Sequence, residues 1–259
     1  SLYVVVTFKA TAPLVVYALS LHSALPILSL PKKPPATAWR QIPQGIKLTT
    51  LIKRSRPGSV PAISSRVNNK RQTAIHLSKC STSCESFERL TFARKLVSAA
   101  LHEKAGILGI WVLGFDEAQQ CGLVSDLLSA ALAAGFNLPD FKSKAAPERI
   151  KSIQIIGLHK KMDVSRIAAE ASGNNLARCL TALPANKLDA RGYVDLLRDL
   201  AKSNGWQYKK YGVAELTKMG AGAFLAVAQG NADEVAAAWP DDEDGVLSPL
   251  DIPINQLLR

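Results

Sequence analysis

Short apolar runs of strand length alternate with helix-length segments between residues 73 and 158. Residues 107–115, with the sequence ILGIWVLGF, carry no charged side chain and match a strand that is buried on both faces. Residues 46–52 and 73–77 are further strand candidates because they are rich in β-branched residues, and residues 150–158 complete the set. Strands without a polar face need cover on both sides. The pattern therefore predicts an α/β fold, with a mixed sheet and helices on both faces.

Two helices are predicted between these strands. Residues 84–104 place apolar side chains at helical spacing after Ser83, whose hydroxyl suits the first position of a helix. Gly106 is expected to end this helix. The second helix is expected over residues 116–136, with a row of leucines, valine and alanines on one side.

A second group of elements follows after residue 160. Asp163 is expected to cap a helix that Pro184 breaks, and Asp189 is expected to cap another helix that Gly205 closes. A short strand over 206–211 and a short helix over 213–219 are predicted next.

Composition divides the chain into an apolar head, an α/β domain, a second domain and an acidic tail, at residues 1–35, 36–160, 161–234 and 235–259. The head is interrupted by Lys9 and Pro13, which suits neither a membrane helix nor a signal peptide. Within it, the run from Ser20 to Ile27 resembles a peptide that arises when a common sequencing adapter is translated. We therefore expect residues 1–35 to be non-native or unstructured and to lie outside the fold.

The formal charge of +11 is distributed unevenly. No Asp or Glu occurs from residue 40 to residue 79, whereas the basic residues there are Arg40, Lys47, Lys53, Arg54, Arg56, Arg66, Lys70, Arg71 and Lys79. Such a stretch either attracts phosphates, as in a nucleic-acid-binding module, or is the solvated face of a soluble protein. Only Trp39 lies near it for base stacking, which disfavours recognition of single strands.

Cysteine and histidine patterns give little support for a site. Cys80 and Cys84 are close in sequence and His76 precedes them, but no second pair completes a zinc pattern, so reduced thiols are the expectation. The other members of these classes are far apart: Cys121, Cys179, His102 and His159. Gly220 and Gly222 predict a turn, because the trailing Gly or Lys of a phosphate loop is missing.

A series of short motifs in the second domain has a familiar order. Residues 173–178 read GNNLAR, residues 180–189 read LTALPANKLD, and residues 219–231 read MGAGAFLAVAQGN, with Gly205 and Trp206 in between. The series resembles the segment that leads into the catalytic domain of the cytosol (leucyl) aminopeptidase family. The last motif is similar to that family's methionine-glycine-x-glycine run. Residues 36–160 fit the family's N-terminal domain by architecture.

The resemblance implies a metal-dependent aminopeptidase of the cytoplasm that acts on peptides and assembles as a homo-hexamer, some members also binding DNA. Members use two divalent metals, zinc or manganese, which share a water, lower its pKa and polarise the peptide carbonyl. Their metal-binding motifs lie downstream of the glycine-rich run, and residues 232–259 contain none of them.

No catalytic, cofactor-binding or metal-binding residue is therefore assigned, and no metal is expected on this chain. The adjacent carboxylates of residues 241–244 are expected to be solvated, since a metal cage takes ligands from separate elements. Arg178 is expected to pack or to form a salt bridge on a helix surface. We expect a truncated leucyl aminopeptidase that is inactive alone and has no membrane partner. The apolar surface that it would expose between Ala168 and Val227 favours self-association.

Overall fold

The computed structural model describes most of the chain, namely residues 3–8, 24–56, 59–68, 72–81, 84–103, 106–139, 141, 150–158, 160 and 162–228. The chain forms two compact units, which span Ser1–Ala171 and Ser172–Arg259. The prediction for residues 235–259 lies outside the described residues.

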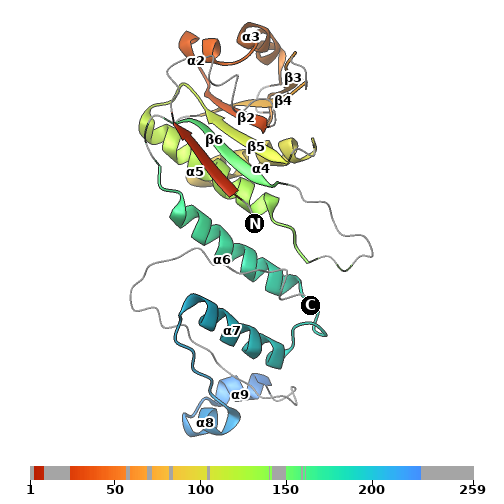
Figure 1. The fold of residues 1–259 in the computed structure, drawn as a ribbon, viewed down its shortest axis with the longest axis vertical. Coiled ribbons are helices and arrows are strands. Elements are labelled where there is room, and N and C mark those ends of the chain that lie inside the picture. The colour runs from red at the N-terminus through yellow and green to blue at the C-terminus, as the bar shows by residue number, and fades with distance from the viewer. Residues whose placement is uncertain are drawn as a thin grey trace. The chain divides into compact units, whose positions relative to one another are not determined.

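The first unit is built around one six-stranded sheet (Figure 1). Its strands lie in the order β1-β6-β5-β2-β4-β3, and every neighbouring pair is parallel except β3 with β4. The strands are β1 (Tyr3–Phe8), β2 (Ala24–Pro31), β3 (Ile63–Arg66), β4 (Ala74–Cys80), β5 (Ile107–Val112) and β6 (Ser152–Leu158). The helices are α2 (Ala36–Gln41), α3 (Gly45–Arg54), α4 (Ser86–Leu101) and α5 (Glu117–Gly135).

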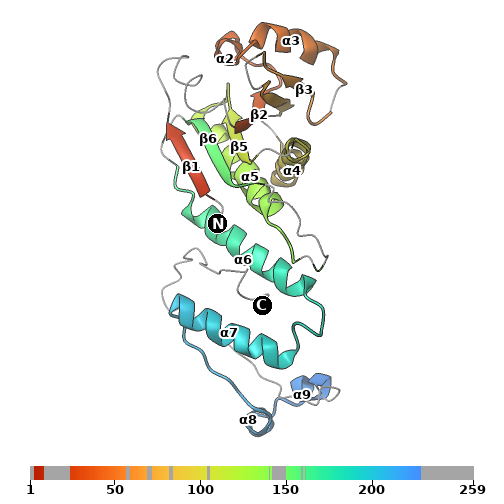
Figure 2. The same ribbon diagram turned by 45° about the vertical axis from the view of Figure 1, so that its right-hand side comes forward.

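Helices cover both faces of the sheet, as the apolar strands predict, and the α/β fold class is confirmed. Alternate residues of a strand point to opposite faces, so Ile110 and Trp111 of β5 enter different cores. Ile110 packs in the core that α4 and α5 close, whereas Trp111 packs in the core that α2 and α3 close. Figure 2 shows α4 and α5 beside the sheet and α2 and α3 near β3.

The expectation that residues 1–35 lie outside the fold is wrong for β2, which is a central strand between β5 and β4. Ile27, Leu28 and Leu30 are fully buried. Two prolines in a central strand are unusual, because a proline has no N–H to donate. Pro26 pairs only with β5 and Pro31 pairs only with β4, so each proline occupies a position where β2 has a single neighbour.

The strand predicted over residues 46–52 is a helix, α3. Leu48 and Ile52, four residues apart, lie on its buried side with Leu51 packed beside them. The β-branched residues that favoured a strand are accommodated by helical contacts: the Thr49 hydroxyl donates to the Gly45 carbonyl at 2.8 Å. Burial of one face thus overrides local preference.

The second unit begins within α6 (Ser165–Ala182) and contains α7 (Ala190–Asn204), α8 (Val213–Lys218) and α9 (Gly222–Ala228). The predicted caps are confirmed. The Asp163 carboxylate accepts from the Ser165 N–H at 2.9 Å, and the Asp189 carboxylate accepts from the Gly192 N–H at 2.7 Å. Gly205 ends α7 with a φ of 71°. Residues 206–211 form no strand; of these residues only Gln207 makes an isolated β-bridge.

Candidate functional site

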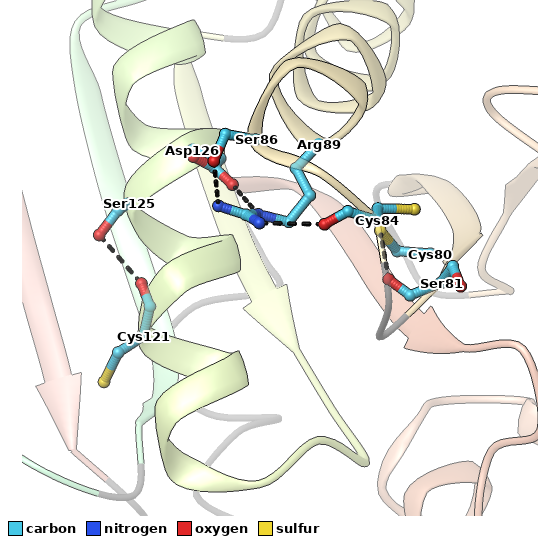
Figure 3. A network of polar contacts seen from close by, with 8 residues as sticks. All are labelled: Cys80, Ser81, Cys84, Ser86, Arg89, Cys121, Ser125 and Asp126. Carbon is cyan, nitrogen blue, oxygen red and sulfur yellow. Dashed lines mark hydrogen bonds and ion pairs between the residues drawn. The ribbon is translucent and has the colours of Figure 1, made fainter.

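Two cysteine side chains meet where β4 ends and the chain turns into α4 (Figure 3). Cys80 is the last residue of β4, and Cys84 lies just ahead of the first residue of α4. The Cys80 thiol donates to the Ser81 carbonyl at 3.5 Å, the Cys84 side chain lies beside it, and both thiols are free. Cys80 is 2% exposed, whereas Cys84 is partly exposed. The pair therefore has one sheltered thiol and one that solvent reaches.

Arg89 of α4 holds the second cysteine in place. Its Nη1 donates to the Cys84 carbonyl at 3.1 Å and its Nη2 donates to the Ser86 hydroxyl at 3.4 Å. Its Nε donates to the Asp126 carboxylate of α5 at 2.8 Å. One guanidinium therefore links the residues at the start of α4 to the neighbouring helix α5 (Figure 3). A guanidinium presents several donors in a fixed plane, which suits this role.

Burial raises the pKa of the Cys80 thiol to about 12, and the neighbouring Cys84 side chain adds to the effect through its charge and its hydrogen bond. The thiol form of Cys80 is thus favoured, and the thiolate is the reactive species. Burial also raises the pKa of Cys179 in α6. Cys121 lies in α5, away from the cysteine pair in Figure 3.

His76 of β4 is buried and contacts the neighbouring strand β3. Its Nδ1 is 2.8 Å from the hydroxyl of Ser64, its partner on β3. Burial lowers the pKa of His76, Glu103 opposes this shift and His102 adds to it. Its Nε2 is buried without a hydrogen-bond partner among the described residues. The geometry is a sheet-edge hydrogen bond, with no carboxylate bonded to the imidazole.

The other predicted candidates fall in separate places. His102 follows the last turn of α4, and Arg178 donates to the Asn175 side chain at 2.9 Å, an amide on its own helix. Gly220, with a φ of 72°, makes the predicted turn between α8 and α9. His159 and residues 241–244 lie outside the described residues.

The metals of the resembling family do not fit the donor set that the described residues offer. Nowhere in that part of the chain do three His, Cys, Asp or Glu side chains come together as a metal site requires. Likewise, none of the helices described is long and apolar enough to cross a membrane.

Curated proteins similar to this chain share one description. A cytosol aminopeptidase of Sulfurihydrogenibium is 30% identical over 118 residues, which cover 42% of this chain and 23% of the relative. The Synechocystis cytosol aminopeptidase is 26% identical over 144 residues, 53% of this chain and 28% of the relative. Part of the chain is thus similar in sequence to cytosol aminopeptidases. The matches span about a quarter of each relative's length, and no model of a known protein family matches the sequence.

Solved structures agree on the fold. A variant of tomato leucine aminopeptidase superposes with a TM-score of 0.70 at 14% identity, over 92% of this chain and 50% of that chain. The leucyl aminopeptidase of Trypanosoma cruzi gives 0.66 at 16% identity, over 89% and 47%. The bottromycin maturation enzyme BotP, solved in complex with Mn, gives 0.55 at 18% identity, over 82% and 43%. The leucine aminopeptidase fold is thus shared over about half of those chains.

Sequence reasoning noted that Cys80 and Cys84 are close in sequence but assigned them no site, and it missed the residues that organise the pair. Arg89 and Asp126 lie on different predicted helices, and the sequence carries no sign that they meet. After Glu117 in the first turn, Asp126 is the one charged residue of the mainly apolar helix α5. A single charged residue in the middle of a mainly apolar, buried helix indicates that an oppositely charged side chain lies near it.

Proposed function

We propose that the protein is the N-terminal part of a leucyl aminopeptidase, an enzyme that removes N-terminal amino acids from peptides with the help of two divalent metals. The observation that carries this proposal is the shared fold with tomato leucine aminopeptidase over 92% of the chain. The sequence relation to cytosol aminopeptidases supports it independently. In this proposal, residues 36–160 with β2 form the domain that precedes the catalytic domain, and residues 161–234 begin the catalytic domain.

The proposal includes inactivity of the chain alone. The metal motifs that the resemblance implies follow the glycine-rich run at residues 219–231, and residues 232–259 do not contain them. The described residues supply buried cores and helix ends, and we assign none of them to the reacting metals. Their role is to position the catalytic half: α7 buries Val194, Leu196 and Leu200 and so provides a fixed base for the elements that follow.

Inactivity is tested with the purified full chain and leucine p-nitroanilide, with Mn²⁺ or Zn²⁺ added. The expected result is no metal-dependent release of p-nitroaniline. Metal-dependent release that a chelator abolishes would overturn this part of the proposal.

A chimera tests the family role itself. This chain replaces the matching part of the Sulfurihydrogenibium cytosol aminopeptidase, whose own metal motifs are retained. We expect metal-dependent hydrolysis of leucine p-nitroanilide by the chimera. The control carries Leu200→Asp, which puts a charge into the buried face of α7 and should abolish activity. A chimera that folds yet is inactive contradicts the proposal.

Assembly and location follow from the same proposal. We propose a homo-hexamer in the cytoplasm for the whole enzyme, with peptides as substrates and no membrane partner. Light scattering of the active chimera tests the assembly, and a monomeric active species would contradict it. For this chain alone, the apolar surface between Ala168 and Val227 is proposed to favour self-association, and a monodisperse monomer would count against that.

Binding of duplex DNA is a second candidate function, favoured by the placement of the basic residues. Arg40, Lys47, Lys53 and Arg54 are all exposed on α2 and α3 or at their ends. Phosphate contacts of this kind weaken steeply as salt rises. Fluorescence anisotropy with a labelled duplex at low salt should show binding that is lost on adding salt and reduced in Lys47→Glu. No binding at low salt excludes this function.

A further inference from the structure

The cysteine pair has a chemistry that the aminopeptidase proposal does not use. Cys80 and Cys84 are separated by three residues, and their side chains lie beside each other (Figure 3). A disulfide requires the two Cβ atoms to lie a few ångströms apart, which only neighbouring side chains can meet. We propose that Cys80 and Cys84 are a reversible disulfide site, oxidised by a small disulfide such as glutathione disulfide.

The unequal exposure of the two thiols sets the order of the steps. Cys84 is partly exposed and therefore meets the glutathione disulfide first. Cys80 is 2% exposed, too sheltered for a tripeptide to reach, but it contacts the Cys84 side chain. The buried thiol therefore resolves the mixed disulfide formed at the exposed one.

The exchange balances without any further reactant. The Cys84 thiolate attacks one sulfur of glutathione disulfide, forms the mixed disulfide and releases one glutathione thiolate. The Cys80 thiolate then attacks the Cys84 sulfur, forms the Cys80–Cys84 bond and expels the second glutathione thiolate. The two protons lost by the cysteines go to the two glutathiones. The protein thus loses two electrons, and glutathione disulfide is reduced to two glutathione thiols.

The residues around the two thiols fix the position of Cys84, and those described add no further metal ligand to the pair. Arg89 donates to the Cys84 carbonyl at 3.1 Å and pairs with Asp126 at 2.8 Å, so the backbone of Cys84 is positioned before oxidation. Figure 3 shows the cysteines, Arg89 and Asp126 in one cluster between β4, α4 and α5. No third His, Cys, Asp or Glu joins the pair as a metal ligand among the residues described.

Differential alkylation of the full folded chain tests the site. Trypsin is expected to release residues 80–89 as one peptide that holds both cysteines, because Lys79 precedes it and Arg89 ends it. After incubation with glutathione disulfide, the expected result is loss of iodoacetamide labelling at both positions. Both labels should return after treatment with dithiothreitol. Labelling is carried out after unfolding in guanidinium chloride so that the buried Cys80 is reached, and Cys179 should stay labelled before and after as the control.

Single variants separate the two roles. Cys80→Ser should stop at the glutathione mixed disulfide on Cys84, and Cys84→Ser should leave Cys80 as a free thiol. Cys121→Ser, on α5, should behave as the wild type. The proposal is overturned if the wild type retains glutathione on Cys84 while Cys80 stays free, or if neither cysteine reacts. Because no aminopeptidase readout is used, this result does not depend on the outcome of the chimera.

Discussion

Arg89 and Asp126 form an ion pair of 2.8 Å that ties α4 to α5 under partial cover from solvent. The side chain of Asp126 is 14% exposed and that of Arg89 is 31% exposed. The same guanidinium also donates to the Cys84 carbonyl. The Arg89 side chain therefore both links the two helices and holds the backbone of Cys84 in place.

We expect Asp126→Asn to destabilise the first unit by about 1–3 kcal/mol, because the partly buried guanidinium loses its carboxylate partner while the shape is kept. Urea denaturation followed by circular dichroism measures this change. The control is Glu170→Gln, which removes the exposed pair between Arg166 and Glu170 and should change the stability much less, because solvent screens exposed charges. Equal losses in the two variants would contradict the prediction.

Gln120 connects α5 to the ends of two strands. Its Nε2 donates to the Val112 carbonyl at 2.9 Å and to the Gly157 carbonyl at 3.1 Å, and the residue is 2% exposed. Gln120→Leu keeps the volume but removes both hydrogen bonds, so we expect a loss of about 1–3 kcal/mol in the free energy of unfolding. Gln119→Leu, one residue earlier and less buried, is the matched control. A change no greater than the control's would show that the bridge is dispensable.

The sequence predicted the elements that have a regular spacing of apolar residues or a capping residue. Residues 107–115 contain β5 because a short run without charged residues is typical of a strand that is buried on both faces. Asp189 caps α7 because its carboxylate accepts an N–H that the helix leaves free. These features are local. They depend on neighbours within a few residues, which a sequence displays directly.

What could not be predicted depends on long-range pairing. Residues 46–52 contain the β-branched residues of a strand, and only the sheet face beneath them makes a helix the better way to bury Leu48 and Ile52. Pro26 and Pro31 fit β2 only because β5 and β4 are offset along it. The link between Arg89 and Asp126 likewise joins residues 37 positions apart.

His76 should make the stability of the first unit depend on pH. Burial lowers its pKa below the ordinary value of 6.5, so the folded chain keeps the imidazole neutral while the unfolded chain binds a proton. Stability is therefore full above the unfolded pKa and falls as the pH drops below 6.5, until the lowered folded pKa is reached. Urea midpoints should decrease as the pH is lowered from about 7.5 to about 5. This range extends about one unit above and about 1.5 units below the ordinary histidine pKa of 6.5.

A variant separates this residue from other titrating groups. His76→Asn does not titrate there and keeps a polar side chain beside Ser64, so its midpoint should vary less with pH than the wild type's. His102→Asn, at the exposed end of α4, should retain most of the dependence. An unchanged slope in His76→Asn would assign the effect to another group.

Oxidation of the cysteine pair should stabilise the chain by a modest amount. The Cys80–Cys84 bond closes a short loop, and the chain-entropy model gives about 2 kcal/mol for a loop of about five residues, less any strain in the native geometry. Urea denaturation of the oxidised chain, with and without dithiothreitol, measures the difference. Cys84→Ser should show none, because it cannot form the bond. If the oxidised wild type is instead less stable than the reduced form, the bond strains the turn that Arg89 holds, and the two thiols then lie close without being arranged for a disulfide.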